Sequence, residues 1–455
     1  MTASCVPLQK AARRRKLVAA LFLAHFGLYS AFGAEGVYTS GVGARSMALG
    51  GADVAFPEGP LSALGVNPAG LSLLECPTLD IGATATVPAG HFQSRASDKG
   101  ALENRFGIAP DVALELPVGS SPVRFGIGLI PEAGVDAHWR YLDPPGGKDG
   151  KTSYGFQNNN SKVTVLRSAA GMSIALSRWF SVGGSLGLDY NENWLQTPYV
   201  FQSQPALKGQ KALLNLDANG WGLNGSVGML FCPADQFQIG LSYQSPTEVD
   251  SRGSVSGNAN AQLRSLGGPF ANARPDFHYN AEMDRTFPQK ILGGVSWKFH
   301  PRWRLALQAD WVNWSDAFDV LPVKLTKGNN ADLTRFVGSS HFEEDILLRW
   351  RDQVVYRAGV EYALTEAFFL RGGYAYGRSP VPDETLTPLT AVIPEHTLTA
   401  GAGYRWRCFQ FDLACQWDLP TTRHVDRSAL LDGEYSQSRL RVGAHWFGLT
   451  TSVHF

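Results

Sequence analysis

The sequence has few cysteines, no excess of charge of either sign and a single long apolar run. Five cysteines among 455 residues, with Cys5 near the start, do not make the framework of a small disulfide-rich protein. Cys408 and Cys415 are predicted on one strand with their side chains on opposite faces, so they cannot pair with each other. A bond between Cys76 and Cys232 requires that the fold bring them together. Because 40 basic residues balance 40 acidic ones, net charge indicates no nucleic-acid partner.

The one long apolar run lies at the start of the chain. The basic segment Gln9–Lys16 leads into the apolar residues Leu17–Leu28, a pattern typical of a secretory signal peptide. We predict that residues 1–33 form this peptide and that cleavage follows Gly33 or Ala34. The alternative, a membrane anchor, needs about 20 apolar residues, and the run is shorter. With no other such run, the mature chain is predicted to contain no transmembrane helix.

Motifs of catalysis and cofactor binding are also scarce. The ten histidines show no metal-ligand spacing, and no nucleophile motif is present. The stretch Gly41–Ser46 loosely resembles a dinucleotide-binding loop, but no strand precedes it and its third glycine is missing. The acidic segment His341–Asp345 is interpreted as a solvated loop. We therefore expect neither a cofactor, a metal nor an enzyme.

The sequence is rich instead in glycine, aromatic residues and alternating segments. It contains 49 glycines, and apolar and polar residues alternate with period two in segment after segment, which predicts half-buried β-strands. Examples are Phe237–Gln244, Trp303–Trp311 and Leu398–Trp406. In a soluble sandwich the apolar face is core, whereas in an outer-membrane barrel it faces lipid and the polar face lines a lumen.

Three observations favour the barrel. Aromatic residues lie at the ends of the apolar faces, as interfacial girdles require, and the chain ends on an alternating run that closes with Phe455. Short and long connections alternate, as periplasmic turns and extracellular loops do. The strands number about fourteen, so we predict an all-β, transmembrane antiparallel barrel over residues 78–455. A change of phase near Phe447 and Gly448 predicts a bulge in the last strand. Residues 34–77 show no strand alternation and are predicted to plug the lumen as an N-terminal hatch.

Several segments resemble a known family. They read GARSMALGGADVAF (Gly43–Phe56), NPAGLS (Asn67–Ser72), WVNWSD (Trp311–Asp316), WRDQVVYRAGVEY (Trp350–Tyr362), LRGGYAYGRSPVPD (Leu370–Asp383) and IPEHTLTAGAGY (Ile393–Tyr404). In this order they resemble the hatch, late strands and C-terminus of the FadL/TodX family of outer-membrane transporters of long-chain fatty acids and hydrocarbons. Residues 89–283 match only in strand pattern, so the family's ligand-pocket residues there are not placed.

The resemblance implies a fourteen-stranded barrel in the outer membrane of a Gram-negative bacterium. Hydrophobic molecules are then expected to pass from outer loops to an interior pocket and to leave sideways through the wall. The hatch motif Asn67, Pro68 and Ala69 is a candidate gate, with local backbone bonding by Asn67 as the alternative. Pro131 and Gly134 are the candidate wall kink, because proline cannot donate to a ladder and glycine marks a bend. The alternative is a strand that ends at Ile130.

The predicted lumen is basic, which favours an anionic headgroup such as a carboxylate. The candidate headgroup contacts are Arg304, Arg357, Arg371 and Arg405, and Arg439 and Arg441 are also predicted on the inner face. The alternative for each arginine is a bond to hatch carbonyls or neighbouring acids.

Two other functions stay open, a general porin and a barrel-based hydrolase. Expected partners are the ligand, outer-membrane lipid and lipopolysaccharide, and the barrel-assembly machinery through Phe455, with the chain as a monomer.

Overall fold

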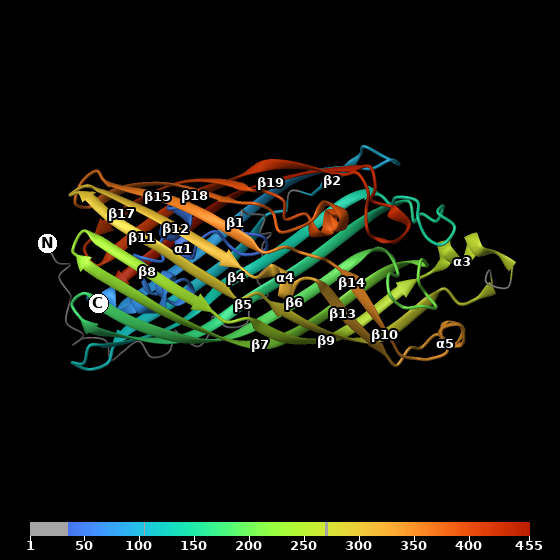
Figure 1. The fold of residues 1–455 in the computed structure, drawn as a ribbon, viewed down its shortest axis with the longest axis horizontal. Coiled ribbons are helices and arrows are strands. Elements are labelled where there is room, and N and C mark those ends of the chain that lie inside the picture. The colour runs from blue at the N-terminus through green and yellow to red at the C-terminus, as the bar shows by residue number, and fades with distance from the viewer. Residues whose placement is uncertain (1–34, 104, 269–271) are drawn as a thin grey trace.

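The computed structural model describes residues 35–103, 105–268 and 272–455, and these are dominated by long antiparallel strands (Figure 1). The predicted signal peptide lies outside the described residues. The strands are β1 (Thr78–Gln93), β2 (Gly100–Leu102), β3 (Gly107–Pro117), β4 (Val123–Leu142), β5 (Phe156–Ser177), β6 (Phe180–Val200), β7 (Lys211–Ala234), β8 (Phe237–Gln244), β9 (Thr247–Asn258), β10 (Asp276–Phe287), β11 (Lys290–His300), β12 (Trp303–Val312), β13 (Val320–Thr326), β14 (Phe342–Leu347), β15 (Gln353–Ala363), β16 (Phe368–Gly377), β17 (His396–Trp406), β18 (Phe409–Val425) and β19 (Ser438–His454). The helices are α1 (Gly43–Ala48), α2 (Pro60–Gly65), η1 (Pro68–Leu73), α3 (Asn260–Leu266), α4 (Trp314–Ala317), α5 (Ala331–Val337), η3 (Asp383–Thr385), η4 (Pro388–Thr390) and η5 (Leu431–Gly433).

The strands close into one antiparallel barrel. β1 pairs with β3 on one side and with β19 on the other, which joins the two ends of the sheet. At four places in the wall, two successive strands lie end to end and count as one wall strand. These are β8 with β9, β10 with β11, β12 with β13, and β14 with β15. With β2 as a short extension beside β1, the wall has fourteen strands, as the sequence predicted. Closure leaves no open sheet edge in the membrane, where unpaired backbone groups are costly.

The two faces of the wall differ as the alternation predicted. On β12, Leu307 is 45% exposed on the outside and Asp310 is 1% exposed on the inside. The predicted bulge in the last strand is wrong, because β19 pairs with β1 in unbroken register from His454 to Arg439. The prediction assumed that Trp446 faces outward. Trp446 is instead buried and donates to Asp418 inside the barrel, so no change of phase is needed.

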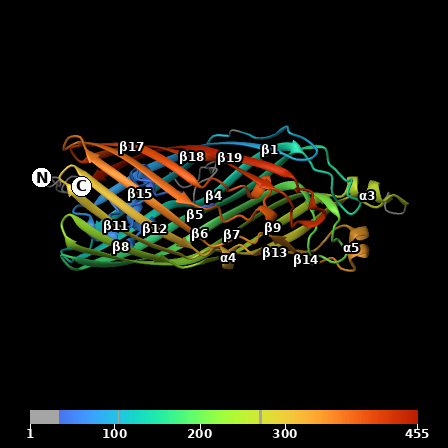
Figure 2. The same ribbon diagram turned by 45° about the horizontal axis from the view of Figure 1, so that its top comes forward.

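Short and long connections lie at opposite ends of the barrel. The short turns and the carboxyl terminus lie at the left in Figures 1 and 2, and the long loops with α3 and α5 lie at the right. Short connections, such as those between β3 and β4 and between β15 and β16, alternate with longer ones as predicted. The sequence predicts long loops over residues 131–161 and 191–210, but both are partly strand, since β4 continues to Leu142 and β6 to Val200. The outer faces of these extensions lie beyond the apolar band of the barrel and are polar. Their sequences therefore lack the apolar alternation of a membrane strand.

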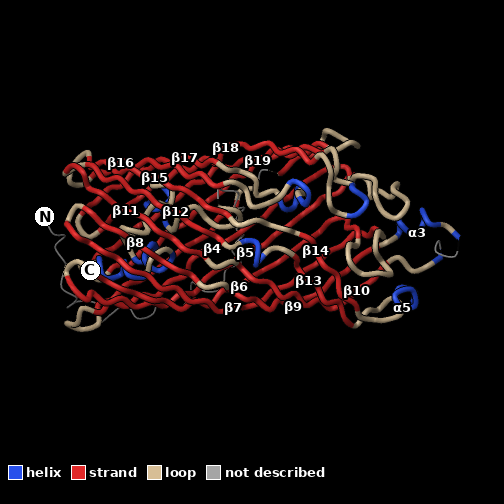
Figure 3. Tube along the Cα trace, viewed as in Figure 1, coloured by secondary structure: helices blue, strands red, loops and turns tan. Residues whose placement is uncertain are grey.

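Residues 35–77, called the N-terminal segment below, lie inside the barrel near the turn end. Figure 3 shows helices within the ring of strands there. Glycines of the wall allow this close packing. A Cβ on Gly373 of β16 would lie 2.3 Å from the carbonyl carbon of Leu49, and one on Gly228 of β7 would lie 2.0 Å from Oδ1 of Asn67. The high glycine content therefore reflects contact between backbone and wall as well as turns.

Cys232, Cys408 and Cys415 are free cysteines, so Cys232 does not pair with Cys76. Cys408 lies in the turn between β17 and β18, and not on the strand that carries Cys415. None of the helices in the described residues is long and apolar enough to cross a membrane.

Candidate functional site

Asn67 fastens the N-terminal segment both to itself and to the wall. Its side-chain amide donates to the carbonyl of Val54 at 2.8 Å and to that of Met229 on β7 at 3.2 Å. Its Oδ1 accepts from the backbone N–H of Ala69 at 3.2 Å and so caps η1. Pro68 and Ala69 are buried beside it. The local backbone bond predicted from the sequence is present, together with the bond to Met229 of the wall.

Pro131 and Gly134 both lie within β4, which continues beyond them. Its register with β5 shifts between Pro131 and Ala133, so Glu132 is the extra residue of a bulge. The interruption lies on the other side of the strand. β3 pairs with β4 only as far as Leu129, and β2 resumes the pairing at Trp139. Between these points the wall ladder between β3 and β4 is missing.

The N-terminal segment covers this break from inside. Gly134 donates to the carbonyl of Val37 at 2.9 Å, and Thr39 donates to that of Glu132 at 3.3 Å. Tyr38 forms an antiparallel bridge with Ala133. Three residues of the N-terminal segment thus take the place of a neighbouring strand and satisfy backbone groups that the wall leaves unpaired.

The bulge residue is held by a charged side chain of the neighbouring strand and by polar side chains of more distant strands. Glu132 forms an ion pair with Arg167 of β5 and another with Lys290 of β11, whose Nζ lies 3.4 Å away. Gln244 of β8 also donates to its carboxylate at 2.5 Å. Because Glu132 is buried, this network stabilises the inward position of β4 against the cost of desolvating the charge.

The four arginines predicted as headgroup contacts all have protein partners. Arg357 donates to Asp310 at 2.5 Å and to the carbonyl of Gly50 at 2.9 Å, and also pairs with Glu35. Arg371 binds Glu361 and Asp412.

The other two lie beside the N-terminal segment. Arg405 pairs with Glu58 at 2.8 Å. Arg304 donates to Ser296 at 3.0 Å, and its guanidinium lies 3.7 Å from the centre of the Phe56 ring. The four arginines contact the N-terminal segment or wall acids around it.

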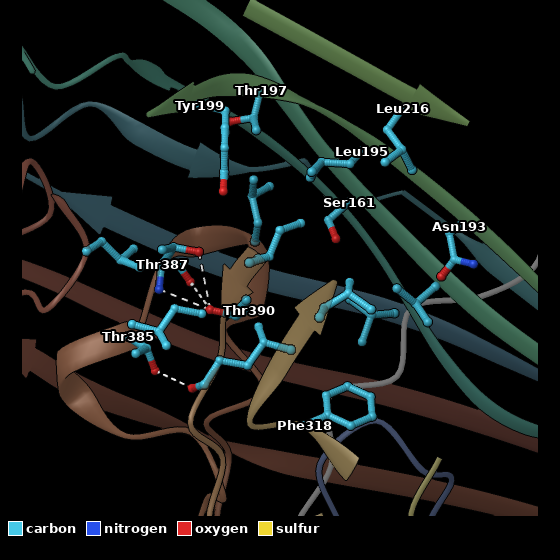
Figure 4. A pocket seen from close by; sticks show the side chains of 18 of the residues that line it. Ser161, Asn193, Leu195, Thr197, Tyr199, Leu216, Phe318, Thr385, Thr387 and Thr390 are labelled. Carbon is cyan, nitrogen blue, oxygen red and sulfur yellow. Dashed lines mark hydrogen bonds between the residues drawn. The ribbon is translucent and has the colours of Figure 1, made fainter. Parts of the chain in front are cut away.

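An inner cavity lies farther toward the loop end, above the N-terminal segment. It has a volume of about 180 Å³ and a mostly apolar lining that includes Val37, Val135, Phe318 and Trp350. Figure 4 shows Leu195 and Tyr199 of β6, Leu216 of β7, and threonines of the β16–β17 loop, η3 and η4 gathered around it. Because Val37 and Val135 belong to the covered break in β4, the cavity ends at that break.

Charge in the cavity wall is unevenly compensated. Lys162 pairs with Glu192 at 2.7 Å, and Glu434 pairs with Lys211 at 2.8 Å. Arg285 of β10 has no acidic partner among the described residues. It donates to Oδ1 of Asn193 at 2.8 Å, and its buried Nε has no hydrogen-bond partner there. Arg285 is therefore the one unpaired charge of the described cavity wall.

Two sets of contacts, one between Tyr435 and Tyr141 and one around Lys211, close the cavity at its loop end. The hydroxyls of Tyr435 and Tyr141 lie 3.3 Å apart, and burial raises the pKa of Tyr435 well above its ordinary value, so it remains protonated. Lys211, fully buried, also binds Asp143 at 2.8 Å. Burial raises the pKa of the Asp143 carboxyl, and the nearby Lys211 opposes this. These contacts hold together the β4–β5, β6–β7 and β18–β19 connections at the loop end.

A second cavity of about 600 Å³ opens between the loops that carry α3 and α5. Apolar residues line much of it, among them Leu207, Leu263, Leu266 and Phe277. Alternation did not reveal either cavity, because both lie where strand ends and loops from distant parts of the sequence meet. Only Trp350 of these lining residues fell in a motif that the sequence singled out.

A closed antiparallel barrel with a filled turn end, an apolar inner cavity and aromatic outer residues defines an outer-membrane β-barrel protein. The chain belongs to the family described as outer membrane protein transport protein (OMPP1/FadL/TodX), whose family model matches residues 20–455.

Individual relatives are distant. The long-chain fatty acid transport protein of Escherichia coli (strain K12) is 22% identical over 192 residues, which are 42% of this chain and 40% of that protein. The alignment thus spans less than half of the curated relative. A Pseudomonas aeruginosa FadL homologue has a TM-score of 0.73 at 15% identity, covering 92% of this chain and 100% of its own. The Pseudomonas putida toluene transporter TodX has a TM-score of 0.71 at 20% identity, covering 92% and 99%. At these identities the structures show a common fold.

Proposed function

We propose that this protein carries hydrophobic small molecules, such as long-chain fatty acids or hydrocarbons, across the outer membrane by diffusion. The observation that carries the proposal is the apolar cavity that ends at the covered break between β3 and β4. A hydrophobic molecule gains free energy by entering lipid and loses it in periplasmic water. A lateral exit therefore suits such a ligand better than passage through the filled turn end. The names of the relatives, a fatty acid transport protein and a toluene transporter, agree with this class of ligand.

The proposed route has three steps. The loop cavity beside α3 captures the ligand, the inner cavity holds it, and displacement of Val37–Thr39 from β4 opens the break. Residues 34–77 act as the hatch, and Asn67, Pro68 and Ala69 keep its centre in place while its first residues move. Phe106, just before β3, and Ile108 of β3 are apolar and are 63% and 42% exposed. They lie beside the break, which suits an exit into lipid.

Arg285 favours a ligand with an anionic headgroup. A carboxylate in the cavity gives the guanidinium the acidic partner that the protein does not provide, in surroundings where a charged hydrogen bond is strong. Arg304, Arg357, Arg371 and Arg405 act instead in holding the hatch and the wall around it. Arg357, Arg371 and Arg405 bind acids, and Arg304 donates to Ser296 and lies over the Phe56 ring. The headgroup role predicted for a basic lumen thus moves to Arg285.

The rival functions find less support. A general porin needs an open lumen, and the N-terminal segment fills this one at the turn end. We propose passive transport and not hydrolysis, and an esterase assay on the purified barrel checks this. Phe455, whose N–H donates to Pro77 at 2.9 Å, is the proposed contact for the barrel-assembly machinery of a monomeric chain.

The test removes the bulge that shapes the break. Deleting Glu132 together with Pro131→Val should let β4 run straight beside β3 and close the exit. We expect uptake of a labelled fatty acid or hydrocarbon by cells to fall about tenfold or more. Heat-dependent gel migration checks that equal amounts of folded barrel are compared.

The matched control deletes Leu176, the extra residue where β5 shifts register against β6 near a turn. This variant loses a bulge but keeps the break, so its uptake should match that of the wild type. If the Glu132 deletion transports as fast as the control, the lateral exit is wrong, and passage past Asn67 through the hatch becomes the better hypothesis.

A further inference from the structure

Five basic side chains lie on the outer surface of the barrel near its loop end. They are Arg140 of β4, His91 of β1, Arg439 and Arg441 of β19, and His424 of β18, and all five are exposed. We call them the basic row. The sequence predicted Arg439 and Arg441 on the inner face, and this is wrong. The unbroken register of β19 with β1 turns both outward.

Strand pairing places these side chains side by side. Arg441 lies opposite His91, and His91 is separated from Arg140 only by Ala101 of β2. Arg439 lies opposite His424 in the next register position. Neighbouring strands are about 4.8 Å apart, so the row extends over roughly 20 Å of the wall.

The protein does not neutralise this row. None of its five side chains forms an ion pair or hydrogen bond with the described residues, in contrast to Arg357 and Arg371 in the lumen. β19 contains no acidic residue, and the one acid of β1, Asp80, is buried. The basic row is therefore free to bind an anion from outside the chain.

The height of the row indicates the source of that charge. Phe447 and Leu449 of β19 are each 50% exposed on the lipid side, and above them Trp417 stacks on His445 with ring centres 5.9 Å apart. From Val453 to Arg441, a rise of about 3.3 Å per residue on a strand tilted by roughly 40° amounts to roughly 30 Å. Arg441 thus lies just beyond an apolar band about 25 Å tall, on the side of the long loops.

We propose that the basic row binds phosphate groups of lipopolysaccharide, the phosphorylated glycolipid of the outer leaflet. Guanidinium groups match phosphate oxygens with paired hydrogen bonds, and several basic side chains at one membrane level act together. The part of β4 without a partner on the β3 side ends at His138, and Arg140 lies two residues farther along the strand. The bound lipid therefore lies beside the break in the wall. The site does not depend on the transported ligand.

The test compares two variants of the full-length protein in mild detergent. One carries Arg140→Gln, Arg439→Gln and Arg441→Gln. The control carries Lys298→Gln and Arg302→Gln, two exposed basic residues at the turn end. Native mass spectrometry measures retained lipopolysaccharide, and thermal unfolding measures the stabilisation when purified lipopolysaccharide or its dephosphorylated form is added.

We expect wild type and control to retain and be stabilised by the phosphorylated lipid, and the triple variant to bind it about tenfold or more weakly. The dephosphorylated lipid should stabilise none of them to the same extent. Equal binding by the triple variant overturns the proposal, and so does an equal effect of the dephosphorylated lipid. Uptake of the transported ligand in vesicles without lipopolysaccharide should be the same for all three, which separates this site from the transport proposal.

Discussion

At the scale of single residues, pairing decides which charges are free to meet a ligand. The lumen contains many basic side chains, but most of those around the N-terminal segment already bind acids or carbonyls. Arg357 alone contacts Asp310, Glu35 and Gly50. Arg285 lacks such an acid and faces an apolar cavity, so its charge is available.

Arg285→Leu tests this difference. A hydrogen bond to a charged group contributes about 1.5–3 kcal/mol, so we expect affinity for a long-chain carboxylate to fall roughly tenfold to hundredfold. Affinity for a neutral hydrocarbon should change little, as measured by displacement of a fluorescent ligand. Lys162→Leu is the control, since Lys162 already has Glu192 as partner. Equal loss for both ligand types contradicts a headgroup role for Arg285.

Asn67→Ala tests the fastening of the N-terminal segment. The change removes three hydrogen bonds and leaves the carbonyls of Val54 and Met229 without this donor, which costs about 1–3 kcal/mol per buried group. We expect faster amide hydrogen exchange in the segment, and brief ion-conducting openings in planar bilayers. Ser72→Ala, which removes a bond to Ala69 within the same segment, should show neither effect. A silent Asn67→Ala variant indicates that the segment is held elsewhere.

At the scale of elements, the loops and the bulged strand β4 have different roles in the proposed route. β4 is continuous along its β5 side and broken along its β3 side, so one strand both completes the wall and leaves an exit. α3 contributes apolar residues to a cavity at the far end.

Leu263→Asp on α3 tests capture by this cavity. A charge among apolar lining residues disfavours a hydrophobic ligand, so uptake at low ligand concentration should fall severalfold. At saturating concentration uptake should approach that of the wild type, because the inner cavity and exit are intact. Arg264→Asp, on the same helix but outside the lining, is the control. If both variants behave alike, the effect is one of surface charge.

At the scale of the whole molecule, the barrel and its contents are separable. Outside the stretch of β4 that Val37–Thr39 cover, the wall strands satisfy their own backbone hydrogen bonds, and Arg357 and Arg371 keep wall acids as partners without the N-terminal segment. Deletion of residues 35–74 should therefore leave a folded barrel. We expect a stepwise rise in single-channel conductance in planar bilayers. Unchanged conductance of a folded deletion means that the segment does not block the lumen.

Much of the architecture follows from the sequence alone. Period-two alternation determines which side chains face lipid, because a strand turns successive residues to opposite faces whatever its neighbours are. The same rule, with the spacing of turns, yields about fourteen strands and the segment without strands before them. It failed at Trp446, where a single aromatic residue inside the barrel resembled a girdle residue.

The working parts depend on tertiary structure. Arg357 and its partner Glu35 are 322 residues apart, so no local pattern shows that this charge is paired while that of Arg285 is not. Pro131 and Gly134 indicated the irregular strand, but only the register with β3 locates the break and only the fold places Val37 over it. The cavities and the basic row likewise arise where strands distant in sequence become neighbours, because closure of the barrel, and not any one segment, determines which residues meet.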